Sequence, residues 1–110
     1  MKDKFSAVTS VETLEQLAAD SQSRPVVIFK HSTTCPISSA AYREMSQVKD
    51  SVSMIIVQQS RGVSREVEAR TGVRHESPQA IILRNGKAVW SASHYDITAD
   101  GVERALSEHS

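Results

Sequence analysis

Cysteine is the scarcest chemically reactive residue in this sequence, and its scarcity excludes several kinds of protein. The chain of 110 residues has one cysteine, so no disulfide can form within it. A single thiol and scattered histidines also lack the ligand spacing of a zinc site, and we expect no bound metal. The N-terminal segment Met1 to Ser6 lacks the apolar stretch of a secretory signal. These absences predict a reducing, cytoplasmic setting.

An excess of charge of one sign is also missing. Lys plus Arg and Asp plus Glu number 13 each, so net charge gives no reason to expect nucleic acid or an anionic membrane as a partner. No apolar run approaches the roughly 20 residues that a membrane-spanning helix needs. We therefore expect a protein that binds neither nucleic acid nor a membrane.

The length and composition that remain are those of one globular domain. Hydrophobic residues make up 39% of the chain and charged residues 24%, which is typical of a folded protein. A chain of this length is sufficient for one hydrophobic core. We therefore predict a single domain spanning residues 1–110, without internal repeats.

Helical periodicity and capping residues predict four helices. Thr9 and Glu12 fit a capping box at the start of the first helix, and Gly72 suits the end of the third. Thr98 is the expected cap of the last helix, with Val102, Ala105 and Leu106 facing inward. The predicted helices cover Thr9–Asp20, Pro36–Lys49, Val63–Thr71 and a segment that begins after Thr98.

Apolar and β-branched runs between these helices predict four strands. A helical crossover joins the first two strands, which should therefore be parallel and connected with a right hand. Asn85-Gly86 predicts a tight hairpin between the last two. The expected architecture is α/β, a mixed four-stranded sheet with helices on both faces. The predicted strands are Pro25–Lys30, Val52–Gln58, Gln79–Leu83 and Lys87–Ser91.

The single cysteine, Cys35, lies where the first predicted strand passes into a helix. Pro36 follows it, at a position suited to the first helical turn. Unpaired N–H groups and the positive end of the helix dipole favour an anion there, so the thiol should favour the nucleophilic thiolate. An inert buried cysteine is the alternative.

Four separated segments resemble the monothiol bacilliredoxins, the YtxJ-like family of thioredoxin-fold proteins. They extend over roughly residues 26 to 106, with the proline of the second segment directly before the third predicted strand. The matching segments are Phe29–Ser38, which contains the motif Thr-Cys-Pro-Ile-Ser, then Gly72–Ala80, Asn85–Trp90 and Ala92–Thr98.

The resemblance implies a thioredoxin fold and a thiol–disulfide oxidoreductase that acts on bacillithiol. Cys35 would be the catalytic nucleophile, supported by Thr34, Pro36 and Ile37. The implied partners are S-bacillithiolated proteins, whose caps transfer to Cys35 by thiol–disulfide exchange. No tightly bound cofactor is implied, and bacillithiol itself serves as the thiol co-substrate.

Ser38 takes the place of the second cysteine of a C-x-x-C motif. A serine cannot resolve a mixed disulfide on Cys35, so an external thiol such as a second bacillithiol must release the cap. Ser38 could also donate a hydrogen bond to the thiolate, or simply be a solvated serine. The resemblance further implies that Pro78 is a cis-proline facing Cys35, with the Ser77 backbone offered to an extended substrate. An ordinary trans proline at an edge strand is the alternative.

Two further groups of residues are candidates for substrate binding. The cationic candidates flank the loops expected to meet at Cys35, where they would bind the carboxylates of bacillithiol's malyl group or stabilise the thiolate. The alternative for each is a solvated surface charge. Asp96 and Thr98 precede the last helix and could hold the thiol ligand, or could simply cap the helix. The cationic candidates are Lys30, His31, Arg74 and His75.

Other functions remain open at this stage. An iron–sulfur carrier could hold a cluster between two subunits through one Cys35 each, although Pro36 disfavours this by analogy with glutaredoxins. A non-catalytic binding module with a thioredoxin fold is a second alternative. A peroxiredoxin is disfavoured because Ile28 stands where that family has a proline.

Overall fold

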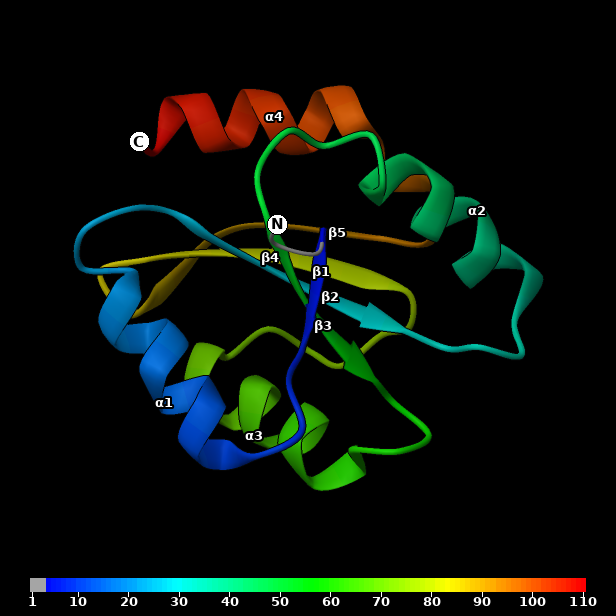
Figure 1. Ribbon diagram of the computed structural model, residues 1–110, viewed down its shortest axis with the longest axis horizontal. Coiled ribbons are helices and arrows are strands. Elements are labelled where there is room, and N and C mark those ends of the chain that lie inside the picture. The colour runs from blue at the N-terminus through cyan, green and yellow to red at the C-terminus, as the bar shows by residue number, and fades with distance from the viewer. Residues whose placement is uncertain (1–3) are drawn as a thin grey trace.

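A computed structural model describes residues 4–110, and its centre is a mixed sheet with strand order β1-β3-β2-β4-β5 (Figure 1). As predicted, β2 is parallel to β3, while β4 and β5 form an antiparallel hairpin. The central strand β2 also pairs with β4 in the antiparallel direction. The strands are β1 (Phe5–Ala7), β2 (Val26–His31), β3 (Val52–Ile56), β4 (Gln79–Arg84) and β5 (Lys87–Ser93).

The sheet has five strands, so the prediction of four is wrong. The additional strand, β1, is three residues long and pairs in parallel with the edge of β3. Three residues are too few to show the alternation by which a strand is recognised. The first three residues of the chain lie outside the described residues. They belong to the segment Met1 to Ser6, in which no secretory signal was expected.

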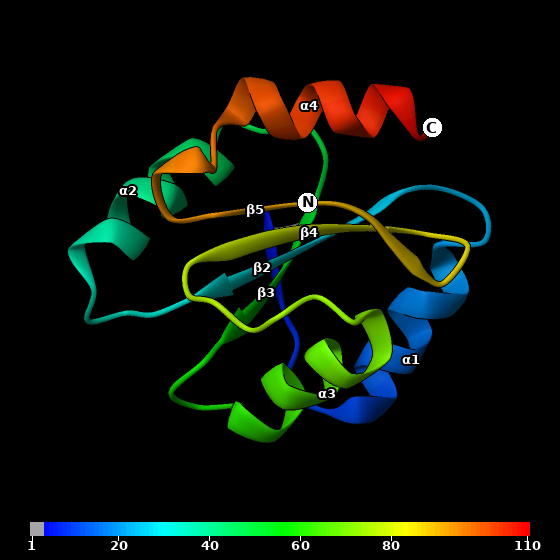
Figure 2. The ribbon, with the colours of Figure 1, turned by 180° about the vertical axis from the view of Figure 1, so that it is seen from behind.

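Two helices cover each face of the sheet (Figures 1 and 2). Leu14 of α1 and Val63 and Val67 of α3 pack in one hydrophobic cluster, while α2 and α4 pack in another on the opposite face. Within residues 4–110, no helix is both long enough and apolar enough to cross a membrane. The helices are α1 (Val11–Asp20), α2 (Pro36–Met45), α3 (Arg61–Thr71) and α4 (Ala99–Glu108), with a short 3₁₀ turn, η1 (His94–Asp96), before α4.

The strand β2 decides which residues face which pair of helices. Val27 and Phe29 belong to the cluster under α2 and α4, and Val26 and Ile28 to the cluster under α1 and α3. Side chains alternate between faces along a strand. The side chain of Lys30 therefore points toward α3, and the side chain of His31 points toward α2.

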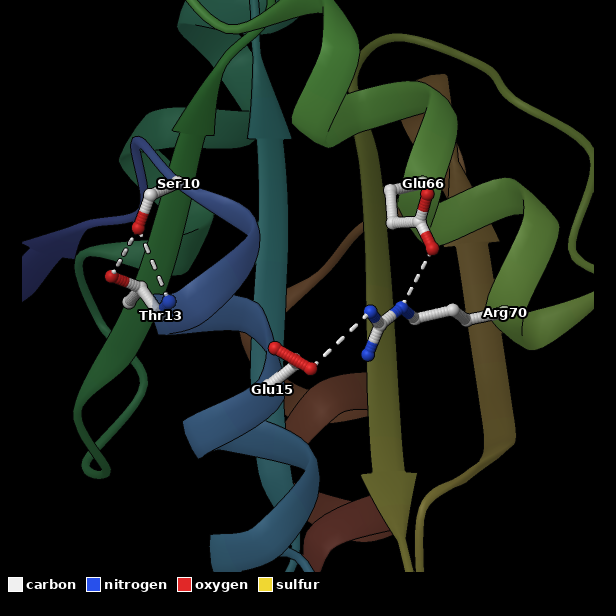
Figure 3. A network of polar contacts seen from close by, with 5 residues as sticks. All are labelled: Ser10, Thr13, Glu15, Glu66 and Arg70. Carbon is white, nitrogen blue, oxygen red and sulfur yellow. Dashed lines mark hydrogen bonds and ion pairs between the residues drawn. The ribbon is translucent and has the colours of Figure 1, made fainter.

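The capping box predicted for the first helix is wrong. Ser10 is the N-cap of α1, and its Oγ accepts a hydrogen bond from the Thr13 N–H at 3.2 Å (Figure 3). The helix therefore begins at Val11, and Thr9 lies before the cap. Both residues can cap a helix, so local sequence left the choice between them undecided.

The helix α2 ends at Met45, four residues before its predicted end. The Ser46 hydroxyl donates a hydrogen bond to the Arg43 carbonyl at 2.7 Å, and the following backbone bonds are those of turns. A serine that bonds to a preceding carbonyl competes with helix continuation. Val48 nevertheless remains in the core, 1% exposed, so the apolar pattern was correct although the helix boundary was not.

Three other local predictions are confirmed. Gly72 ends α3 with φ 73°, and Asn85 and Gly86 form the hairpin with φ 56° and 75°. Thr98 caps α4 by accepting from the Gly101 N–H at 3.1 Å. The remaining boundaries shift by a few residues: β3 is shorter than predicted, and α3, β4 and β5 are longer.

Polar contacts tie the helices to one another on each face. On one face, Arg70 of α3 donates to Glu66 at 2.8 Å and lies 3.8 Å from Glu15 of α1 (Figure 3). On the other face, Glu44 of α2 accepts a hydrogen bond from the Ala99 N–H, at the start of α4, at 2.9 Å. The exposed ion pairs contribute little stability, and the buried apolar residues hold the helices on each face.

Candidate active site

The thiol of Cys35 lies at the N-terminal end of α2. Cys35 is the N-cap residue, with φ −107° and ψ 125°, and Pro36 is the first helical residue. The side chain makes no capping hydrogen bond, and no acidic residue lies in the first turn. The thiol is partly exposed and free, not buried. A partly exposed thiol beside the positive end of a helix has the surroundings of a reactive cysteine.

Three loops meet near Cys35 at one edge of the sheet. In the parallel pair, His31 at the end of β2 lies beside Ile56 at the end of β3. In the antiparallel pair, Lys30 lies beside Gln79 at the start of β4. The segment leading to Cys35 is therefore bordered by the loop after β3 and by the loop before β4.

The loop before β4 contains a cis peptide bond between Ser77 and Pro78, as the resemblance implied. The Ser77 hydroxyl is buried without a partner, and Ser77 takes part in no backbone hydrogen bond within residues 4–110. The Pro78 carbonyl accepts from the His94 N–H at 3.0 Å. Ser77 therefore has a free backbone N–H and C=O, as recognition of an extended chain requires.

Gln58, which sequence reasoning did not select, holds the loop that leads to Cys35. Its Nε2 donates to Ser32 Oγ at 2.8 Å and to Thr34 Oγ1 at 3.1 Å. Its Oε1 accepts from the Thr33 N–H at 3.4 Å. Its position directly after an apolar strand could have identified Gln58. The carboxyl ends of parallel strands lie at one edge of a sheet, so a residue after β3 lies near the loop that follows β2.

Ser38 is buried at the base of the same loop. Its Oγ accepts a hydrogen bond from the Ser32 N–H at 3.2 Å, and no hydrogen bond joins Ser38 to Cys35 among the described residues. The solvated-serine alternative is wrong, because Ser38 is 0% exposed. Of the other predicted supporting residues, which adjoin Cys35 in the chain, Thr34 and Pro36 are exposed and Ile37 is partly exposed.

Lys30 lies on the α3 side of the sheet, on the face opposite α2. It is 0% exposed, and its Nζ donates to the Ser64 carbonyl at 3.0 Å and lies 3.1 Å from His75 Nδ1. Burial lowers the pKa of Lys30 from 10.5 to about 8, opposed by the negative charge of Glu68. The surface-charge alternative is therefore wrong for Lys30.

His75 is held in this cluster from two sides. Its Nδ1 also lies 3.2 Å from Ser64 Oγ, and its backbone N–H donates to Glu68 Oε2 at 2.7 Å. Burial and the charge of Lys30 lower the pKa of His75, while Glu68 and Glu76 oppose that shift. A neutral imidazole with Nδ1 as acceptor fits the contact with the Lys30 ammonium.

His31 turns to the other face of the sheet. Its ring lies between Phe29 and Tyr42, with centroid distances of 5.4 and 5.3 Å. It is 9% exposed, its Nδ1 has no hydrogen-bond partner within residues 4–110, and burial lowers its pKa. The surface-charge alternative is therefore wrong for His31 as well. The structure divides the predicted group of Lys30, His31, Arg74 and His75. Arg74 is exposed within the loop before β4.

The corner before α4 makes the contacts of a helix cap. The Thr98 hydroxyl is occupied by the Gly101 N–H, as the capping alternative required. Asp96 is exposed in η1. Elsewhere in the described part of the chain, no group of three or more His, Cys, Asp or Glu lies close enough together to hold a metal ion.

Comparisons with known proteins agree with this geometry. The family model of the monothiol bacilliredoxin BrxC matches residues 6–102. A solved structure with a thioredoxin fold is 34% identical, with a TM-score of 0.85 and 92% of each chain covered.

Thioredoxins of known structure share the fold at much lower identity. The thioredoxin of Fasciola hepatica is 13% identical with a TM-score of 0.73, covering 94% of this chain and 98% of its own. That of Trypanosoma brucei brucei is 15% identical with a TM-score of 0.74, covering 94% and 88%. The fold is therefore the thioredoxin fold, as predicted.

Proposed function

The chain belongs to the monothiol bacilliredoxin family, and from that membership we propose that it removes bacillithiol from S-bacillithiolated proteins. The family and the fold make it a thiol oxidoreductase. The observation that carries the finer proposal is the free, partly exposed Cys35 at the N-terminus of α2, in a chain with no second cysteine. A reducing compartment such as the cytoplasm suits such a lone thiol.

The first step is a thiol–disulfide exchange. The Cys35 thiolate attacks the bacillithiol sulfur of the mixed disulfide, and a new bond forms between that sulfur and Cys35 Sγ. The old S–S bond breaks, and the target's sulfur leaves as a thiolate that takes up a proton from water. The target cysteine is reduced, and Cys35 is now capped.

The second step needs a thiol from outside the chain. Ser38, at the position of a second cysteine, has no sulfur with which to displace the cap. A second bacillithiol attacks the sulfur of the cap, forms oxidised bacillithiol and releases the Cys35 thiolate. Bacillithiol is thus both the group removed and the reductant consumed.

The surroundings of Cys35 support the docking of a protein substrate. The free N–H and C=O of Ser77 can pair with an extended segment of the capped protein. Gln58 forms hydrogen bonds with Thr33 and Thr34. These bonds stabilise the loop that positions the Cys35 thiol. No resident cofactor takes part in either step.

Intact mass spectrometry after mixing with a bacillithiolated protein tests the proposal. We expect bacillithiol to leave the target and to appear on Cys35. Cys35→Ser is the matched control and should receive no cap. Absence of transfer from several different targets would contradict the proposal, and full biological activity of Cys35→Ser would favour a binding module.

A further inference from the structure

A cationic hollow lies on the α3 face of the sheet, separate from the thiol. Its volume is about 230 Å³, below the roughly 300 Å³ at which pockets for drug-sized ligands begin, so it suits a small group. Two arginines of α3 line it, together with His75. The lining residues are Val57, Arg61, Ser64, Arg65 and His75.

The charged side chains that line this hollow are all basic. Arg61 and Arg65 are exposed and take part in no ion pair within the described residues, and no acidic residue lines the hollow. Beside the lining, the Glu68 carboxylate accepts the His75 N–H at 2.7 Å, and the charges of Glu68 and Glu76 both act on His75. The buried Nζ of Lys30 lies directly behind the lining, 3.1 Å from His75 Nδ1.

The hollow lies at the same edge of the sheet as Cys35. Val57, in its lining, directly precedes Gln58, which holds Thr34 beside Cys35 by a hydrogen bond of 3.1 Å. On the other side, His75 belongs to the loop that leads to Ser77. The hollow therefore lies between two of the three loops that border the thiol, on the opposite face from α2.

We propose that this hollow binds a carboxylate of the bacillithiol malyl group while the bacillithiol sulfur is bonded to Cys35. The inference rests on the proposed function and adds the residues that select the small thiol. Guanidinium groups match a carboxylate with paired hydrogen bonds, and the Ser64 hydroxyl and His75 ring offer further contacts. A cap bonded to Cys35 would reach the hollow over the loop after β3, where Gln58 lies between Val57 of the lining and its hydrogen-bond partner Thr34.

A binding experiment tests the hollow independently of catalysis. L-malate is titrated into the reduced protein while the backbone amide signals of Ser64 and His75 are followed by NMR. We expect saturable shifts that Arg61→Gln and Arg65→Gln weaken, and that Arg104→Gln leaves unchanged. Arg104 is an exposed arginine of α4, on the opposite face, so it controls for loss of charge. Absence of saturable shifts overturns the proposal.

A transfer experiment identifies the source of the carboxylate. The same target protein is capped either with bacillithiol or with uncharged 2-mercaptoethanol, and the rate of transfer to Cys35 is measured. Arg61→Gln and Arg65→Gln should each slow transfer of the bacillithiol cap about tenfold relative to the neutral cap. An equal loss for both caps would assign the hollow to an acidic side chain of the target and overturn the proposal.

The two experiments separate the inference from the function on which it rests. If the wild-type protein accepts neither cap, the proposed function fails, and malate binding still decides whether the hollow takes carboxylates. If it accepts both caps and the arginine variants leave their ratio unchanged, the function stands and the inference fails.

Discussion

The buried Lys30 should make the stability of this protein rise at alkaline pH. Replacing it by methionine keeps a side chain of similar length and removes the charge. Lys30 has no exposed surface, and its two polar neighbours are the Ser64 carbonyl and His75 Nδ1. Neither neighbour carries a negative charge, so burial of the ammonium is not compensated by an ion pair within hydrogen-bonding distance.

The magnitude follows from the difference in proton affinity between the folded and unfolded chains. The pKa of Lys30 is about 8 in the folded protein, against 10.5 for an unperturbed lysine. Because the folded protein binds this proton more weakly, the charged form destabilises the fold below pH 8. The penalty falls as pH rises from 8 to 10.5, and at 1.36 kcal/mol per pKa unit it amounts to at most about 3 kcal/mol.

Urea unfolding at fixed ionic strength, between pH 7 and 10.5, measures this effect. The free energy of unfolding of the wild type, minus that of Lys30→Met, should increase over this range by up to about 3 kcal/mol. Other groups titrate in both proteins, so the difference isolates Lys30. A difference that stays flat across the range would refute the assignment of Lys30 as a buried charge that Glu68 compensates only in part.

Two further substitutions test the mechanism and the fold. Ser38→Cys places a second thiol at the third helical position after Cys35, and we expect oxidation to form an internal disulfide that leaves neither thiol reactive toward a maleimide. Persistence of two reactive thiols after oxidation would show that residue 38 cannot reach Cys35. Thr98→Ala removes the oxygen that accepts the Gly101 N–H and should lower the free energy of unfolding by about 1 kcal/mol in urea. An unchanged value would mean that this cap adds no stability.

The sequence predicted most of the fold because its signals are local. The hairpin at Asn85 and Gly86 requires positive φ at both positions, and the Thr98 cap needs a hydroxyl three residues before an N–H. The missing strand β1 had no such signal, since three residues show no period. Its pairing with β3 depends on a partner nearly fifty residues away along the chain.

The candidate site could be predicted at the thiol and not around it. Short contiguous motifs contain Cys35, Pro36 and Pro78. The sequence around each residue was therefore enough to predict its place in the site. Gln58 acts through contacts with Ser32 and Thr34. Each of these residues lies more than twenty residues before Gln58 in the chain. Only the parallel pairing of β2 with β3 brings them together.

The position of Lys30 shows why a list of nearby cations is not a binding site. Every residue of β2 is buried, so polarity along the strand could not show which side chain faces which helix pair. Side chains along a strand alternate between the two faces of the sheet. Because Phe29 packs under α2, Lys30 points to α3 and His31 points back to α2. Two adjacent cationic candidates thus lie on opposite sides of the sheet. A thiol ligand that reaches both Cys35 and the hollow beside His75 must therefore lie across the sheet edge, and its selectivity should depend on Arg61 and Arg65 more than on His31.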